Sequence, residues 1–318
     1  MTPTDPPAAS ELLAGMVWVQ GGEFSMGSGD HYEEEAPVHS VRVEGFWMDT
    51  YTITNQEFKR FVKETDHVTL AEKPADPRDY PGAIPELLAP SSSVFVQQPG
   101  PVDLRNSYNW WTYVRGANWR HPQGPASTIR GRSQHPVVHV AYEDVEAYAR
   151  WIGKELPSEA EWEFAARGGL DGAEFAWGDE FTPEGQYMAN TWQGEFPHTN
   201  DALDGFEGTA PVGSFPANGF GLYDMAGNVW EWTTDWYQPH GAIEHACCAV
   251  ENPRGGVPEL SYDPATPEVE IPRRVMKGGS HLCAPNYCRR YRPAARMPQA
   301  VDTSTSHLGF RLIVRSAA

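Results

Sequence analysis

Regular periodicity is scarce along this chain, although its aromatic content is that of a folded protein. The sequence contains 30 Gly and 28 Pro, which interrupt helices and strands, together with 12 Trp, a large number for 318 residues. Trp side chains bury large areas while freezing few torsion angles, so they can fix irregular backbone. The sequence therefore predicts a globular chain that is rich in ordered loops and poor in regular secondary structure.

Helical signals occur in three places. Thr54-Asn-Gln-Glu57 and Ser158-Glu-Ala-Glu161 have the spacing of capping boxes, in which the first and last side chains each accept a backbone N–H of the other residue. The first box predicts a helix that ends near Thr65, and the second predicts a helix that ends at Gly168-Gly169. Between them, residues 142–153 have a helical apolar pattern.

Short apolar alternations predict strands on either side of the first helix. We expect a strand pair in residues 16–27, a strand in residues 39–48 and another short strand in residues 135–140. Residues 66–134 have no lasting period but carry many aromatic side chains. A disordered linker would lack these aromatics, so we expect a long ordered loop region packed on the body.

Charge and hydropathy exclude several classes of partner. The 43 acidic residues against 24 Lys and Arg give a net charge of -19, which argues against nucleic-acid and anionic-membrane partners. No apolar run reaches the about 18 residues of a membrane span, and the N-terminus lacks the features of a secretion signal. We therefore expect a cytoplasmic monomer. Residues 1–13 are expected to be a disordered lead, and residues 14–318 a single domain, because no repeat or composition change divides them.

Two of the four cysteines, Cys283 and Cys288, lie five residues apart near the C-terminus. This spacing is not that of a C-x-x-C redox pair, and Pro285 between them disfavours a shared helix. A bent loop can turn both sulfurs toward one point, which could hold a disulfide, a soft metal ion or nothing. We interpret His281 as a surface or pocket-wall residue, and Cys247-Cys248 as free thiols because adjacent cysteines bridge only with strain.

Two segments are rich in the oxygen ligands that hard cations such as Ca²⁺ prefer. Residues 190–206 alternate acids, amides and turn-forming residues, and Asp224 and Glu231 bracket a Gly-Asn turn. Neither segment has the spacing of an EF-hand. From the residues alone, a cation site and a simple turn with hydrogen-bonded or solvated acids fit each segment equally well.

Several motifs together resemble the formylglycine-generating enzymes and the wider sulfatase-modifying factor family. The resemblance covers nearly the whole chain from about residue 14, and it implies an irregular α+β fold related to the C-type lectins. The stretch Ser280-x-x-Cys283-x-x-x-Tyr287-Cys288-x-Arg290-Tyr291-Arg292, followed by Ala294-Ala-Arg296 and Asp302-x-Ser304, resembles the oxidising members in particular. The broader family motifs lie in residues 19–27, 135–140, 156–168, 219–232, 277–280 and 308–311.

The resemblance implies an enzyme that uses O2 to oxidise the cysteine of a Cys-x-Pro-x-Arg motif in an unfolded or nascent sulfatase to Cα-formylglycine. It implies that Cys283 and Cys288 bind Cu(I) and that the substrate cysteine joins them as a further thiolate. Thiolates are soft ligands that select Cu(I), which agrees with this assignment. Ser280, Tyr287 and Trp230 would line the active site around the substrate cysteine and O2.

The resemblance also implies two calcium sites. The first would use the side chains of Asn190 and Asp204 with the carbonyls of Thr191 and Phe206. The second would use the side chains of Asp224 and Glu231 with the carbonyls of Gly227 and Val229.

The chain departs from the family pattern at a few positions. Asp224 and His307 stand where Asn is common, so the second calcium site and the role of position 307 differ from the usual pattern. Pro293 and Leu312 stand where secreted animal members have disulfide cysteines, which agrees with a bacterial-type cytoplasmic protein.

Two other functions fit parts of the sequence. A noncatalytic lectin-like binding module braced by calcium could use the same framework, but it would not need the cysteine pair. An iron-dependent sulfoxide synthase of the ergothioneine type resembles the C-terminal half, but it needs an N-terminal helical domain with an iron motif that residues 1–135 lack. We therefore expect the copper-dependent oxidase, with the binding module as the alternative.

Overall fold

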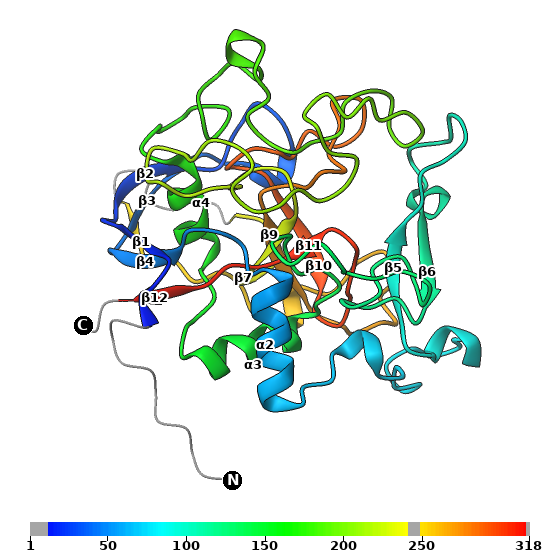
Figure 1. Ribbon diagram of the computed structural model, residues 1–318. Coiled ribbons are helices and arrows are strands. Elements are labelled where there is room, and N and C mark those ends of the chain that lie inside the picture. The colour runs from blue at the N-terminus through cyan, green and yellow to red at the C-terminus, as the bar shows by residue number, and fades with distance from the viewer. Residues whose placement is uncertain (1–11, 241–248, 316–318) are drawn as a thin grey trace.

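The computed structural model describes residues 12–240 and 249–315. Three α-helices and many short strands are joined by long loops in this part of the chain (Figure 1), so the prediction of an α+β fold with little regular structure is confirmed. None of the described helices is both long enough and apolar enough to cross a membrane. The elements are α2 (Asn55–Thr65), α3 (Tyr142–Ile152), α4 (Glu159–Arg167), β1 (Met16–Val19), β2 (Gly22–Met26), β3 (His39–Val43), β4 (Phe46–Asp49), β5 (Ser91–Phe95), β6 (Trp111–Arg115), β7 (Trp230–Trp236), β8 (Val250–Glu251), β9 (Arg273–Lys277), β10 (Arg296–Ala300), β11 (Leu308–Gly309), β12 (Ile313–Arg315) and the 3-10 turns η1 (Glu33–Glu35), η2 (Leu70–Glu72), η3 (Pro85–Leu88), η4 (Ser107–Asn109), η5 (Pro183–Gly185) and η6 (Pro258–Leu260).

All three predicted helices are confirmed. Both capping boxes form: Thr54 and Glu57 at the start of α2, and Ser158 and Glu161 at the start of α4, exchange side-chain and backbone hydrogen bonds. Helix α4 ends at Gly168, whose φ of 57° is the left-handed conformation that Gly adopts readily.

The N-terminal strands exist as predicted, but their pairing is different. Strand β1 pairs with β4, and β2 pairs with β3, so residues 16–27 are not a strand pair. The predicted strand in residues 39–48 is two strands, because the chain changes sheet at Gly45. A Cβ at Gly45 would lie 2.5 Å from the Trp18 ring, so only Gly allows this close approach.

The predicted strand in residues 135–140 is wrong. This segment makes only an isolated bridge between Pro136 and Thr54, together with a bond from the Val137 N–H to the Ile53 carbonyl. Pro136 has no N–H to donate, and His139 has a φ of 60°, which turns the chain out of an extended path. Residues 66–134 are mostly ordered loop as expected, but they include the hairpin of β5 and β6.

The expected N-terminal lead and the second cysteine pair fall largely outside the described residues. This applies to residues 1–11 and to Cys247-Cys248. Leu12 and Leu13 are described, and the Leu13 carbonyl accepts a hydrogen bond from the Met16 N–H at 3.1 Å. Leu12 and Leu13, which the prediction placed in the lead, are thus part of the described structure.

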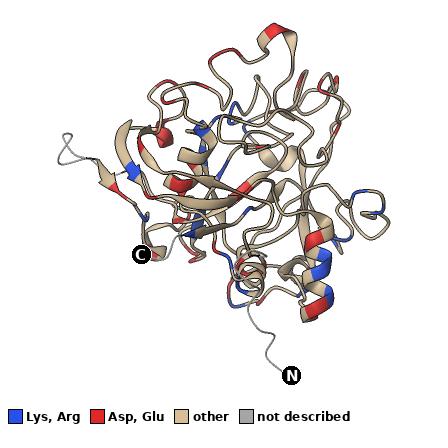
Figure 2. Ribbon diagram, turned by 60° about the vertical axis from the view of Figure 1, so that its left-hand side comes forward, with Lys and Arg blue, Asp and Glu red and all other residues tan. Residues whose placement is uncertain are grey.

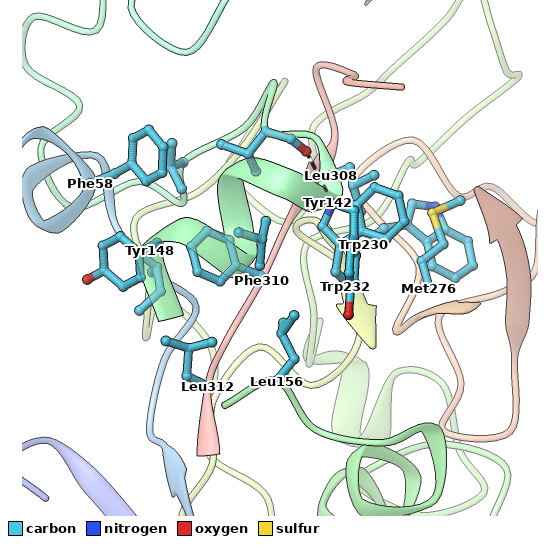
Figure 3. Packing of buried hydrophobic residues seen from close by; sticks show 14 of the residues in the cluster. Phe58, Tyr142, Tyr148, Leu156, Trp230, Trp232, Met276, Leu308, Phe310 and Leu312 are labelled. Carbon is cyan, nitrogen blue, oxygen red and sulfur yellow. Dashed lines mark hydrogen bonds between the residues drawn. The ribbon is translucent and has the colours of Figure 1, made fainter. Parts of the chain in front are cut away.

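A four-stranded sheet in the order β10-β9-β7-β11 supports the predicted site. Strands β9 and β10 are antiparallel, with Lys277 opposite Arg296, so residues 278–295 form a loop whose two ends are paired neighbours. The sheet packs into the main hydrophobic cluster, in which Trp232 and Met276 lie beside Trp230 and Leu308 (Figure 3). The cysteine-containing loop is thus mounted on a rigid core.

Buried ion pairs connect this loop and the strand ends that flank it to α4 and η1. Acidic and basic residues are distributed over many helices, strands and loops of the fold (Figure 2). Three ion pairs near the loop join side chains that are all less than about 5% exposed, and pairing is what a buried charge requires. The pairs are Lys277–Glu163 (Nζ–Oε2 2.9 Å), Arg296–Glu159 (Nε–Oε1 2.7 Å) and Arg292–Glu35 (Nη1–Oε2 2.8 Å).

Candidate active site

The loop that carries Cys283 and Cys288 leaves the sheet through Gly278 and Gly279. Both glycines have positive φ, of 93° and 73°. A Cβ at Gly279 would lie 2.7 Å from the Arg290 carbonyl, so the loop can close on itself only because no side chain is present there.

The two cysteine sulfurs meet as the bent-loop prediction requires. Cys283 and Cys288 are 2% and 7% exposed, and their sulfurs lie 3.2 Å apart without a disulfide bond. The Cys283 N–H donates to the Ser280 carbonyl, and the Cys288 N–H donates to the Ala284 carbonyl, both at 2.9 Å. These turn bonds bring the two thiols together although Pro285 disfavours a shared helix.

The surroundings shift the pKa values of the two thiols in opposite directions. Burial raises the pKa of Cys283 far above its ordinary value. The hydrogen bond from Cys283 to Cys288 lowers the pKa of Cys288 to about 7, against the effect of burial and with help from the Arg290 guanidinium. Of the two thiols, Cys288 therefore loses its proton first, near neutral pH, while Cys283 stays protonated.

Of the three arginines that follow the cysteines, only Arg290 contacts a sulfur. Its Nη1 lies 3.9 Å from Cys288 Sγ, and its guanidinium stacks on the Tyr32 ring at 3.7 Å and pairs with Glu34 at 2.5 Å. Sequence reasoning missed Tyr32 and Glu34. The run of three acids in η1, facing a run of arginines of similar length, is the signal that could have found them.

Ser280 and Tyr287 lie beside the sulfurs. The Ser280 N–H points at Cys283 Sγ at 3.4 Å. The Tyr287 ring stacks on Phe196 at 4.6 Å and meets the edge of Trp110 at 5.0 Å, and burial raises its pKa to about 12. Phe196 and Trp110 were not predicted as part of the site, because nothing in the sequence links them to the cysteines.

Trp230 packs in the same hydrophobic cluster as the two cysteines. The backbone N–H of Trp230 donates to the His307 carbonyl at 2.8 Å, which places position 307 next to it. The His307 ring lies 4.7 Å from Trp111, its Nδ1 contacts Thr305 Oγ1 at 2.7 Å, and burial lowers its pKa to about 3. The imidazole at this position is therefore neutral.

The residues predicted for the first calcium site lie together. Asp204 accepts hydrogen bonds from the Thr191 N–H at 3.0 Å and, through its other oxygen, from the Phe206 N–H at 3.0 Å. Asn190 is 1% exposed, and its Oδ1 is buried with no hydrogen-bond partner. A buried amide oxygen without a donor is suited to a hard cation, so these residues fit calcium.

The second predicted calcium site contains two buried carboxylates, and one of them is already paired with an arginine side chain. Glu231 pairs with Arg311 through both oxygens, at 2.7 and 2.8 Å, and Asp224 accepts the Gly213 N–H at 2.8 Å. Burial, reinforced by the Glu231 charge, raises the pKa of Asp224 to about 6. Because these acids are buried, a turn with solvated acids is wrong here, and the uncompensated negative charge fits a cation.

The described residues contain no cluster of three or more His, Cys, Asp or Glu side chains with metal-binding geometry. The predicted ligand sets are smaller than such a cluster, because they combine two thiols, or two side chains with backbone carbonyls. His281 is not part of either set: its Nδ1 donates to the Asn228 carbonyl at 2.8 Å, and it lines a cavity.

Comparison with known proteins decides the family. Over residues 2–316, the chain matches the sulfatase-modifying factor enzyme 1-like domain. The chain belongs to the sulfatase-modifying factor family. It is 53% identical over 305 residues to the formylglycine-generating enzyme of Mycobacterium tuberculosis, covering 95% of this chain and 98% of that protein. It is 45% identical to the formylglycine-generating enzyme of Mus musculus, covering 94% of this chain and 74% of that protein.

The sulfatase-modifying factor fold is also found by structural comparison. The structure of PvdO from Pseudomonas aeruginosa matches with a TM-score of 0.62 at 25% identity and covers 95% of this chain and 94% of that chain. The irregular fold expected from the resemblance is thus confirmed. The family also includes the inactive C-alpha-formylglycine-generating enzyme 2 of Bos taurus, which is 37% identical over 93% of this chain and 86% of that protein. Family membership alone therefore does not assign the reaction. The assignment depends on the residues of the site.

Proposed function

We propose that this member of the sulfatase-modifying factor family is a copper-dependent oxidase. It uses O2 to convert the cysteine of a Cys-x-Pro-x-Arg motif in sulfatases to Cα-formylglycine. The observation that carries the proposal is the pair of buried, unbridged thiols of Cys283 and Cys288, with sulfurs 3.2 Å apart. The 53% identity to a formylglycine-generating enzyme supports a peptidyl cysteine as the substrate.

The two sulfurs fit a Cu(I) ion. Thiolates are soft ligands that favour this ion, and a metal ion displaces protons from the thiols that bind it. Cys288, with a pKa of about 7, is already partly deprotonated at neutral pH. When bound, copper would supply a redox-active centre with room for the sulfur of the substrate cysteine.

The neighbouring residues orient and protect the reacting groups. Arg290 stabilises negative charge on Cys288, and the Ser280 N–H does the same for Cys283. The Trp230 and Tyr287 rings exclude water from the site, which strengthens these electrostatic interactions. Because both sulfurs are almost fully buried, the substrate motif must reach them in an extended segment, as a nascent or unfolded sulfatase can provide.

The two calcium ions would act on the framework and not on the reaction. Asn190, Asp204 and the carbonyls of Thr191 and Phe206 would hold the first ion. The second would lie at Asp224 and Glu231 with the carbonyls of Gly227 and Val229. Since strand β7 starts at Trp230, the second ion would fix the strand that carries this active-site ring.

An aldehyde-capture assay tests the proposal. A peptide with the Cys-x-Pro-x-Arg motif is incubated with copper-loaded protein, O2 and a thiol reductant, and it is then treated with an aminooxy probe. We expect labelled peptide, and no label on a matched Ser-x-Pro-x-Arg peptide. A blank result from protein of verified copper content would reject the oxidase. It would favour the noncatalytic binding module, for which an inactive relative gives a precedent.

A further inference from the structure

A cavity of about 350 Å³ lies against the segment that precedes Cys283. His281 and Leu282 form one part of its wall, and Phe95 and Val138 add apolar surface to the wall. Its volume falls in the range of about 300–1,000 Å³ that small-molecule sites occupy. None of the residues assigned above to copper, calcium or the substrate cysteine lines this cavity.

Two buried polar side chains in the wall have acceptor atoms that the protein does not use. Asn55 is 5% exposed, and its Oδ1 has no partner although its Nδ2 donates to the Arg132 carbonyl at 3.0 Å. His281 is 8% exposed, and its Nδ1–H donates to the Asn228 carbonyl, which leaves Nε2 as an acceptor. No described residue donates to that Nε2. Buried polar atoms normally have partners, so a ligand that carries N–H or S–H groups would complete this wall.

The lining of the cavity includes charged side chains of both signs. Arg132 and Glu207 line it and are exposed, and neither side chain makes an ion pair or hydrogen bond with any described residue. The arginines of the cysteine loop, in contrast, are paired with acids. A ligand with a carboxylate for Arg132 and an ammonium group for Glu207 would match both charges.

We infer that this cavity binds a small zwitterionic thiol, an α-amino acid or short peptide with a free SH group, which acts as the reductant of the reaction. The inference rests on the proposed function. The cavity's position against residues 281–282 brings such a thiol to the same loop as the reacting sulfurs. The His281 Nε2, which has no partner among the described residues, is an acceptor for its S–H or N–H group.

The electron balance of the proposed reaction requires such a reductant. Conversion of a cysteine side chain to an aldehyde and hydrogen sulfide yields two electrons, whereas reduction of both atoms of O2 consumes four. Two thiols that become one disulfide supply the other two electrons and two protons. One cysteine side chain, one O2 and two thiols thus give one aldehyde, one hydrogen sulfide, one disulfide and one water.

Calorimetric binding to copper-free protein without O2 tests the site separately from turnover. The probes are L-cysteine, 3-mercaptopropionate, which lacks the ammonium group, and cysteamine, which lacks the carboxylate. We expect Arg132→Gln to weaken L-cysteine and 3-mercaptopropionate by about threefold or more and to leave cysteamine unchanged. Glu207→Gln should weaken L-cysteine and cysteamine and leave 3-mercaptopropionate unchanged. The exposed residues Arg130 and Glu268 provide control variants, Arg130→Gln and Glu268→Gln, which should bind as wild type.

Steady-state turnover then tests the role as reductant. With L-cysteine as the only reductant, the KM for L-cysteine should rise in Arg132→Gln and Glu207→Gln, while the KM for the peptide and kcat at saturating thiol stay unchanged. An unchanged KM for L-cysteine, or binding that the two variants do not alter, would overturn the inference. Failure of the proposed function looks different, because wild-type protein would then make no aldehyde with any reductant. In that case the calorimetric result alone would test whether the cavity binds the thiol.

Discussion

At the scale of single residues, two identical thiols acquire different acidities from their surroundings. Cys283 is fully enclosed, whereas Cys288 accepts a hydrogen bond from Cys283 and faces Arg290. The spacing of the cysteines predicted that the sulfurs could meet, but it could not predict which one carries the negative charge. That depends on Tyr32 and Glu34, which hold Arg290 in place from the other end of the chain.

Replacing Arg290 by Met should raise the pKa of Cys288. The substitution removes the cation 3.9 Å from the sulfur, so the thiolate loses stabilisation and its pKa should rise from about 7 by about one unit. The ultraviolet absorbance of the thiolate, titrated in copper-free protein, measures this shift. Arg289→Met is the matched control, because Arg289 pairs with Glu174 and contacts neither sulfur. Superimposable titrations of Arg290→Met and wild type would contradict this account.

Calcium should stabilise the protein more at pH 7 than at pH 5. The pKa of Asp224 is raised from 3.8 to about 6, so its ionisation between these values lowers the free energy of unfolding when no cation is present. A bound cation removes this penalty, and the penalty is larger at the higher pH. Thermal unfolding in calcium and in chelator at both pH values gives the difference in Tm, which Asp224→Asn should reduce. Equal calcium effects at both pH values in wild type would count against the second site.

At the scale of elements, the sequence predicted the helices that depend on neighbouring residues, but it did not predict the contacts between residues far apart in the chain. The helices α2 and α4 were predicted with their ends because a capping box is complete within four residues. The pairing of β1 with β4 and the loss of a strand at residues 135–140 depend on partners distant in sequence. The meeting of η1 with the cysteine loop, across more than 250 residues, is of the same kind.

Removing the cap of α4 should cost stability without changing the site directly. Ser158 Oγ accepts the Glu161 N–H at 3.2 Å, and Glu161 in turn accepts the Ser158 N–H at 2.7 Å. Ser158→Ala should therefore lower the free energy of unfolding by about 1 kcal/mol, measured by urea unfolding. Ser133→Ala, at an exposed serine, should stay within about 0.5 kcal/mol of wild type. Equal stability of the two variants would mean that the capping box does not stabilise the fold.

At the scale of the whole molecule, an irregular framework positions one short loop. The fold class, the cysteine loop and the segments proposed for calcium were all accessible from motifs, because each motif is continuous in sequence. The cavity at Asn55, Arg132, Glu207 and His281 was not, because its residues come from four separate segments that only the fold brings together. The family contains a relative named as a formylglycine-generating enzyme and a relative named as inactive, so we expect the loop and its surroundings to carry the distinction.

The central claim is that Cys283 and Cys288 form a Cu(I) site, and a competition titration against a Cu(I) chelator without O2 tests it most directly. Wild-type protein should bind one Cu(I) per chain. The double variant Cys283→Ser, Cys288→Ser should bind none, and the matched double variant Cys247→Ser, Cys248→Ser should still bind one. Retention of one Cu(I) by the Cys283→Ser, Cys288→Ser variant would contradict the account.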